Sequence, residues 1–75
     1  MERILVVEDN TIANKTISRI LSGNGYKVDS VFSAEDGLFE FNKNRYDLVI
    51  LDLELPKMSG YTFLQVIRKK SDVPV

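Results

Sequence analysis

The apolar residues of this chain change their spacing from segment to segment, and each spacing predicts a different element. Residues 4–7 (Ile-Leu-Val-Val) and 48–51 (Leu-Val-Ile-Leu) are continuous apolar runs. Short runs rich in β-branched residues are typical of strands buried on both faces of a parallel sheet. Residues 26–31 alternate between polar and apolar side chains, which predicts a half-exposed strand at the edge of that sheet.

A segment with helical spacing of its apolar residues lies between the first two predicted strands. Four apolar residues fall on one helical face: Ala13, Ile17, Ile20 and Leu21. Asn10 or Thr11 can cap the start of this helix, and Gly23 or Gly25 can end it.

Two further helices are predicted. Ser33-Ala34-Glu35-Asp36 resembles a capping box that opens the second helix before a polar stop at 42–45. Its buried stripe is expected to contain Ala34, Leu38 and Phe41, with Phe39 in addition. Tyr61, Leu64 and Ile67 mark the third helix, whose last turn holds the basic residues 68–70. Residues 73–75 resemble the start of one more strand.

The predicted order of elements is therefore βαβαβα, an α/β arrangement. Alternating strands and helices imply a parallel, doubly wound sheet with right-handed crossovers. One alternating and two continuous strands favour the order 2-1-3, with the first strand central. In such sheets ligands bind beyond the carboxyl ends of the strands where the strand order reverses. Here that point lies after Val7 and after Leu51.

Composition narrows the possible chemistry. The 75 residues suit one small domain, and cysteine and histidine are both absent. This excludes disulfides, zinc or haem sites built on those residues, a Ser-His-Asp triad and a catalytic cysteine. The net charge of -1 points to no nucleic-acid partner.

Targeting signals are also missing from the sequence, and we expect a cytoplasmic protein without a membrane partner. The apolar run 4–7 is too short for a signal peptide or a membrane span. Asn14-Lys15-Thr16 matches a glycosylation sequon, which we interpret as a chance match because no secretion signal accompanies it.

Acidic residues follow both continuous strands. Glu8 and Asp9 follow the first, and Asp52 and Glu54 follow the third. Acids after one strand can simply end it and face water, but acids after two strands that meet at the switch point predict a site. Two unit charges ~4 Å apart repel by about 4 kcal/mol at an effective dielectric of 20. Oxygen ligands alone favour a hard cation such as Mg²⁺.

Two segments carry a family resemblance. Residues 4–10 (Ile-Leu-Val-Val-Glu-Asp-Asn) resemble the opening of a receiver domain of two-component response regulators. Residues 48–60, with Asp52, Pro56, Met58 and Gly60, resemble the phosphoacceptor segment of that family. The acidic pair, the Asp-x-x-x-Pro-x-Met-x-Gly run and their separation are specific together.

The resemblance implies a flavodoxin-like fold and a regulatory, non-enzymatic role. Asp52 would accept a phosphoryl group from a sensor histidine kinase or a phosphotransfer protein. Mg²⁺ would be bound directly by Asp9 and Asp52, with help from Glu8 through the metal or a water. The backbone carbonyl of Glu54 would complete the protein ligands. Phosphoryl transfer to a carboxylate depends mainly on positioning and charge stabilisation.

The resemblance also implies that residues 1–75 form only part of a receiver domain. Receivers have five strands in the order 2-1-3-4-5, in which the fourth strand usually ends in a Thr or Ser and the fifth carries a Lys. Neither position has a counterpart here, and Lys69 and Lys70 belong to a different element. An uncovered apolar edge strand is an association hazard. We therefore expect self-association through the 48–51 edge or by exchange of the C-terminal segment.

Two other functions are weighed against phosphoacceptance. The chain could be a degenerate receiver that only binds or self-associates, although Glu8, Asp9 and Asp52 argue against this. A phosphatase of the haloacid-dehalogenase type also uses an Asp after an apolar strand. That plan requires a second Asp at position 54, where this chain has Glu, and leaves Glu8-Asp9 unexplained.

Overall fold

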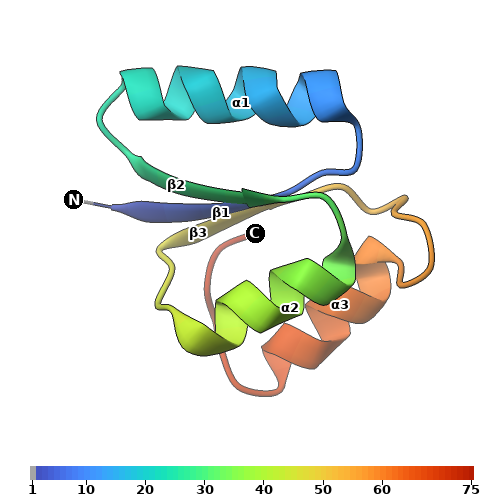
Figure 1. Ribbon diagram of the computed structural model, residues 1–75. Coiled ribbons are helices and arrows are strands. Elements are labelled where there is room, and N and C mark those ends of the chain that lie inside the picture. The colour runs from blue at the N-terminus through green and yellow to red at the C-terminus, as the bar shows by residue number, and fades with distance from the viewer. Residues whose placement is uncertain (1) are drawn as a thin grey trace.

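A three-stranded parallel sheet lies between one helix on one face and two helices on the other (Figure 1). The computed structural model describes residues 2–75, so Met1 of the predicted domain lies outside the described part. The strands are β1 (Arg3–Val7), β2 (Lys27–Val31) and β3 (Leu48–Leu51). Their order is β2-β1-β3, which confirms the predicted α/β fold class and strand order.

Two of the three helices in the described part of the chain begin at caps that the sequence predicts, and the third begins at a cap that it does not. In α1 (Thr11–Gly23) the side chain of Asn10 accepts the N–H of Ala13 at 2.9 Å. In α2 (Ala34–Lys43) the hydroxyl of Ser33 accepts the N–H of Asp36 at 3.1 Å. α3 (Gly60–Arg68) is capped by the side chain of Ser59. Each cap satisfies one of the backbone donors that a helix start leaves free.

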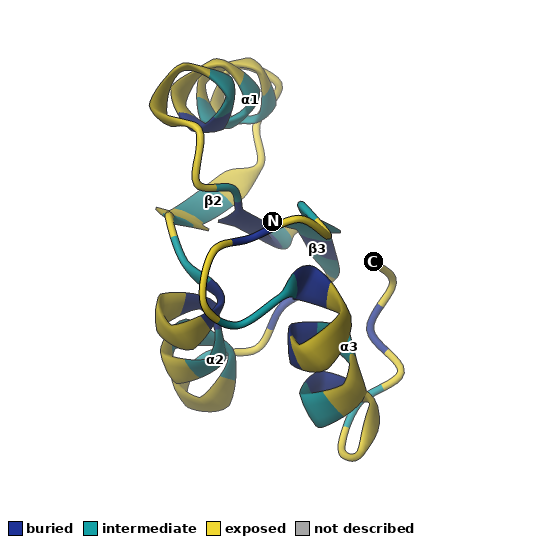
Figure 2. Cartoon of the chain, turned by 90° about the vertical axis from the view of Figure 1, so that its right-hand side faces the viewer, coloured by how far each residue is buried: buried dark blue, intermediate teal, exposed yellow. Residues whose placement is uncertain are grey.

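The core lies between the sheet and the α2/α3 layer (Figure 2). It is built from inward side chains of the strands and from α2, α3 and the loops beside them: Leu5, Val7, Ala34, Tyr46, Val49, Leu55, Phe63, Ile67 and Val73. β1 is central, and Ile4 to Val7 are at most 2% exposed. The prediction of a continuous apolar strand buried on both faces is confirmed for β1, whereas in β3 only Val49 is buried and the other three residues are half-buried.

Three expected core residues lie at the surface instead. Ile20 of α1 is 58% exposed, Phe39 of α2 is 64% exposed and Tyr61 of α3 is 62% exposed. The stripes of α1 and α3 are rotated slightly from the predicted ones, whereas Ala34, Leu38 and Phe41 of α2 face the core as predicted. In α3 the fully buried aromatic residue is Phe63, two positions beyond Tyr61. Exposing a single apolar side chain costs little, so periodicity alone does not decide such flanking positions.

The ends of three predicted strands also differ, and β1 begins at Arg3, one residue earlier than predicted. β2 begins at Lys27, one residue later than predicted, and Tyr26 precedes it as an exposed residue. Residues 73–75 adopt no regular strand, yet they run beside β3. The N–H of Val49 donates to the carbonyl of Pro74 at 2.9 Å, and Val73 is buried in the core.

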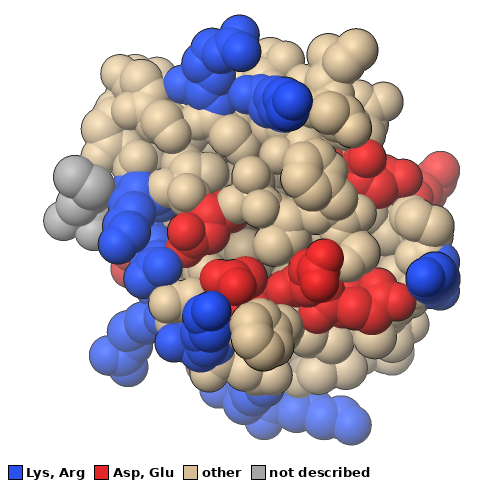
Figure 3. Space-filling view, in the orientation of Figure 1, with Lys and Arg blue, Asp and Glu red and all other residues tan. Residues whose placement is uncertain are grey.

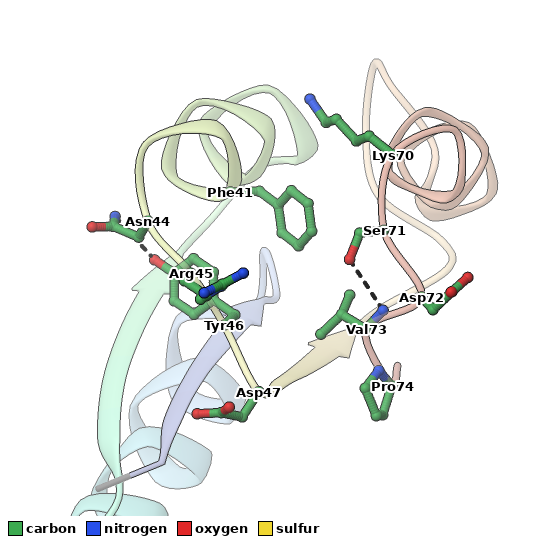
Figure 4. Close-up of a pocket in the computed structure, with 10 residues that line it drawn as sticks. All are labelled: Phe41, Asn44, Arg45, Tyr46, Asp47, Lys70, Ser71, Asp72, Val73 and Pro74. Atoms are coloured by element: carbon green, nitrogen blue, oxygen red, sulfur yellow. Dashed lines mark hydrogen bonds between the residues drawn. The ribbon is translucent and has the colours of Figure 1, made fainter.

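Polar contacts close the amino end of the sheet. The Arg3 guanidinium contacts the Asp29 carboxylate at 2.7 Å, and the Tyr46 hydroxyl donates to the same carboxylate at 2.9 Å. Beside this cluster a groove of about 480 Å³ opens between the α2–β3 connection and the C-terminal segment (Figure 4). Phe41, Tyr46 and Val73 are among its lining residues. Within residues 2–75, no helix is long and apolar enough to cross a membrane.

Candidate functional site

The acidic residues that follow β1 and β3 come together at the carboxyl end of the sheet. Val7 pairs with Leu51 in the parallel ladder, and the N–H of Asp52 donates to the carbonyl of Val7 at 3.0 Å. This register sets Glu8 and Asp52 side by side. One carboxylate oxygen from each of Glu8, Asp9 and Asp52 lies within 4.8 Å of the other two. We call these three residues the acid cluster.

The acid cluster is partly open to solvent. Glu8 and Asp52 are half-buried, whereas Asp9 is exposed. In Figure 3 acidic side chains reach the surface where β1 runs into α1, and the basic side chains of α1 lie above them. An open cluster of this kind is accessible to a cation from solvent.

Repulsion within the acid cluster helps to raise the pKa of Glu8. The N–H of Asn10 donates to the Glu8 carboxylate at 3.0 Å, which lowers the pKa of Glu8. Partial burial, the charge of Asp52 and contacts with the Asp52 and Asp9 carboxyls raise that pKa by more, so the net pKa shift is upward. The fold therefore places Glu8 and Asp52 close enough together to disfavour the charged form of Glu8.

Hydrogen bonds orient two acids of the acid cluster. Glu8 accepts the Asn10 N–H, as described above, and the Oδ1 of Asp52 accepts the N–H of Glu54 at 3.0 Å. Glu54 itself is exposed, and its side chain is not a member of the acid cluster. The predicted ligand role of the Glu54 carbonyl, like the roles of Glu8, Asp9 and Asp52, stays a prediction.

The loop from Asp52 to α3 turns tightly against the helix that follows it. The N–H of Gly60 donates to the carbonyl of Leu53 at 3.2 Å. A Cβ at Gly60 would lie 2.6 Å from the Cα of Leu53, so only glycine fits there without movement. Lys57 in the same loop has a φ of 63°, a left-handed conformation that side chains disfavour. Leu55 and Met58 anchor the loop against the core.

The donor set fits Mg²⁺ by its chemistry. Three carboxylates supply only oxygen ligands, and Mg²⁺ is commonly held by one or two carboxylates together with waters and phosphate oxygens. Neither His nor Cys, the ligands that favour softer metals, occurs in the chain.

One buried polar residue beside the acid cluster was not predicted as functional. Asn14 is 1% exposed, and its side-chain amide donates to the carbonyls of Glu8 at 3.0 Å and Val31 at 2.9 Å. A signal was present in the sequence: position 14 shares a helical face with Ile17 and Leu21. A polar residue in an apolar stripe calls for buried partners.

Comparison with known proteins agrees with this geometry. The family model of the response regulator receiver domain matches residues 4–75. The chain belongs to this family. The E. coli transcriptional regulatory protein HprR is 40% identical to this receiver over 73 residues, which are 97% of the chain and 33% of HprR. The receiver thus spans about a third of the length of the curated relatives it matches.

Solved structures extend the likeness to the fold. The response regulator TrrA of Thermotoga maritima, solved in complex with Mg(2+)-BeF, superposes with a TM-score of 0.90 at 41% identity. The match covers 95% of this receiver and 62% of that chain. A structure of the histidine kinase ThkA in complex with TrrA matches with a TM-score of 0.89 at 39% identity, covering 99% of this chain and 64% of the matched one.

Proposed function

We propose that this receiver is a phosphoacceptor module of two-component signalling, in which Asp52 receives a phosphoryl group. The observation that carries the proposal is the acid cluster, because its carboxylates converge within 4.8 Å at the switch point of a parallel sheet. Family membership supports it, and so does the Mg(2+)-BeF complex of the related TrrA.

In the proposed step, an Oδ atom of Asp52 attacks the phosphorus of a phosphohistidine. The new O–P bond gives an acyl phosphate, the P–N bond breaks, and the leaving imidazole takes up a proton. Asp52 is suited to this role because the Glu54 N–H holds its Oδ1 while the carboxylate stays half-exposed at the mouth of the acid cluster. Mg²⁺ held by Asp9, Asp52 and the Glu54 carbonyl, with help from Glu8, would supply positive charge against the phosphoryl oxygens.

The donor we propose is a sensor histidine kinase or a phosphotransfer protein. The complex of ThkA with TrrA supports a kinase partner for a related chain. We also propose a cytoplasmic location, since a kinase draws its phosphoryl group from cytoplasmic ATP. The acyl phosphate carries about 1.5–2 negative charges where the Asp52 carboxylate carried one, a local change suited to a signalling switch.

Phosphoacceptance is tested by intact-mass spectrometry. The chain is incubated with Mg²⁺ and acetyl phosphate, and we expect one phosphoryl adduct that is lost in Asp52→Asn. Asp72→Asn serves as the matched control, because it removes an exposed carboxylate from the C-terminal segment and should keep the adduct. Absence of an adduct, under conditions that label a complete receiver, would exclude phosphoacceptance for this chain.

A second candidate function is self-association without phosphorylation, and the edge of β3 favours it. The Val49 N–H points outward to Pro74, and backbone N–H groups alternate sides along a strand, so the Leu51 N–H faces the same edge. The C-terminal segment ends beside this edge, and Leu48, Ile50 and Leu51 are only half-buried. Such an edge can pair with another chain.

Sedimentation velocity over a range of concentrations tests self-association. We expect the sedimentation coefficient to rise with concentration and the exchange of the Leu51 amide hydrogen to slow in parallel. A well-folded monomer at high concentration would rule out this second function and would leave the first one standing.

A further inference from the structure

Among residues 2–75, Asn14 of α1 is the one buried polar residue. Its side chain forms a hydrogen bond with the backbone of Glu8, a member of the acid cluster. It is 1% exposed, and its Nδ2 uses both hydrogens, one toward the Glu8 carbonyl and one toward the Val31 carbonyl. Those carbonyls sit at the carboxyl ends of β1 and β2. A single amide therefore ties together a helix and the ends of two strands.

The segment that Asn14 holds is the one that bears two of the three clustered acids. The Glu8 N–H donates to Val31 at 3.1 Å, which extends the β1–β2 ladder one residue beyond β1. With Asn14 on its carbonyl, the backbone of Glu8 is fixed at both of its polar groups. The backbone of Asn14 is also fixed, because its N–H donates to the Asn10 carbonyl at 2.9 Å.

The Glu8 carbonyl belongs to the peptide unit that continues into Asp9. Its orientation therefore sets the direction in which the chain leaves β1 and presents the two carboxylates. Without the Asn14 amide, the Glu8 carbonyl would lose its buried donor, and this peptide unit could turn toward water to recover a partner. The carboxylates of Glu8 and Asp9 would then leave the position where they meet Asp52.

We propose that Asn14 is a positioning residue of the acid cluster, which holds the Glu8-Asp9 turn in the geometry that binds a divalent cation. The part of this inference that concerns Mg²⁺ rests on the proposed function. The part that concerns the turn rests on the hydrogen bonds of Asn14 alone. Partners behind metal ligands commonly change metal affinity by about 10- to 100-fold when they are removed.

Helix α1 also offers a matched control for a substitution of Asn14. Asn24 caps the other end of the helix, and its Nδ2 donates to the Ile20 carbonyl at 2.8 Å in an exposed setting. Asn14→Leu removes two asparagine-to-carbonyl bonds and Asn24→Leu removes one from the same helix. Of these bonds, only the one from Asn14 to the Glu8 carbonyl reaches the acid cluster.

The experiment measures two quantities on each folded variant. NMR hydrogen exchange of the Glu8 amide, relative to the amides of central strand β1, reports the turn. Titration with Mg²⁺ reports the dissociation constant. For Asn14→Leu we expect relative exchange to quicken roughly three- to tenfold, as for one lost hydrogen bond, and the dissociation constant to rise about tenfold. Asn14→Gln, which keeps the amide, should recover part of both effects, and Asn24→Leu should show neither.

The outcomes separate this inference from the proposed function. A folded Asn14→Leu variant with wild-type exchange at Glu8 and wild-type Mg²⁺ affinity would overturn the role of Asn14. Equal changes in Asn24→Leu would assign the effect to general destabilisation and would overturn it as well. If Asn14→Leu does not fold, Asn14→Ser, which keeps one donor, is judged by the same two criteria. If the wild-type chain binds no Mg²⁺, the proposed metal site fails, while exchange at Glu8 still decides the role of Asn14.

Discussion

Replacing Gly60 by alanine should weaken the fold and also slow the proposed phosphorylation of Asp52. A Cβ at position 60 would lie 2.6 Å from the Cα of Leu53 and would also press against the carbonyl of Asp52. Carbon atoms pack at about 3.5–4.0 Å. The start of α3 and the loop from Asp52 to α3 would therefore have to separate by about 1 Å.

Two opposing energies decide the sign of the change in stability. Overpacking against backbone typically costs about 1–3 kcal/mol, whereas alanine gains at most about 1 kcal/mol over glycine in a helix. Because Gly60 is the first residue of α3, where the propensity gain is small, the overpacking cost should dominate. We expect a net loss of about 1–2 kcal/mol in the free energy of unfolding, measured by urea denaturation.

The effect on phosphorylation follows from the same displacement. A shift of about 1 Å at a reacting group can lower a rate by about 100-fold. The assay is the initial rate of adduct formation at Asp52 with Mg²⁺ and acetyl phosphate, corrected for the folded fraction. Gly37→Ala is the control, because its Cβ would meet side-chain atoms of Phe63 at 2.9 Å and Val7 at 3.0 Å in the core. It should cost comparable stability and leave the corrected rate near that of the wild type.

Two results would refute this reasoning. If Gly60→Ala is as stable as the wild type and is labelled as fast, the close approach of α3 to the loop places no constraint on Asp52. If Gly37→Ala slows labelling as much as Gly60→Ala does, the slower rate reflects a generally looser fold.

Three further predictions concern charge and helix stability. Burial raises the pKa of Asp29, but hydrogen bonds from Tyr46 and Arg3 lower it further, so the folded pKa lies below the ordinary value of 3.8. The Asp29 carboxylate therefore stabilises the fold above about pH 4 and loses this effect as the pH falls through the folded pKa. Asp29→Asn should lower the free energy of unfolding by about 1–3 kcal/mol at pH 7. Urea denaturation near pH 3 should find a smaller difference from the wild type. An equal difference at both pH values would contradict the stabilising role of the ionised Asp29 carboxylate. Asp52→Asn removes one negative charge from the acid cluster and should raise the free energy of unfolding by about 1 kcal/mol in metal-free buffer. The same substitution should reduce the stabilisation that added Mg²⁺ provides in thermal melting. A melting temperature that Asp52→Asn leaves unchanged, with and without Mg²⁺, would contradict repulsion and metal binding in the acid cluster. Gly23→Ala places a methyl group where no atom lies within 4 Å, at the end of α1, and should raise stability by about 0.5–1 kcal/mol in thermal melting; a loss would mean that this helix end needs glycine.

Local patterns were sufficient to predict most of the secondary structure. Asn10 and Ser33 cap α1 and α2 as expected, because a cap depends on residues within one helical turn. The strand at 4–7 was predictable because a strand buried on both faces tolerates only apolar side chains. The equally apolar run at 48–51 also forms a strand, although only Val49 in it is buried. The same local view failed for Ile20, Phe39 and Tyr61, since a helical stripe does not specify which flanking residue reaches the sheet.

For the candidate site, the types of residue could be predicted and their contacts could not. The acids at positions 8, 9 and 52 follow two strands, and the rule for parallel sheets brought them to one edge. The contacts of Asn14 could not be predicted, because its partners are the carbonyls of Glu8 and Val31, which lie at the ends of two different strands. The Arg3–Asp29–Tyr46 cluster likewise joins three segments that lie far apart along the chain.

The sequence by itself determined the order of elements, the parallel sheet and the acids that end its strands. These features follow from hydrophobic periodicity, which acts along the chain. Only the tertiary structure decided that three carboxylates converge within 4.8 Å, that Asn14 braces their turn and that the C-terminal segment lies along β3. Such contacts depend on register and on the rotation of each helix against the sheet. Both are set by the packing of the whole core, because a shift of one residue changes which side chains face each other.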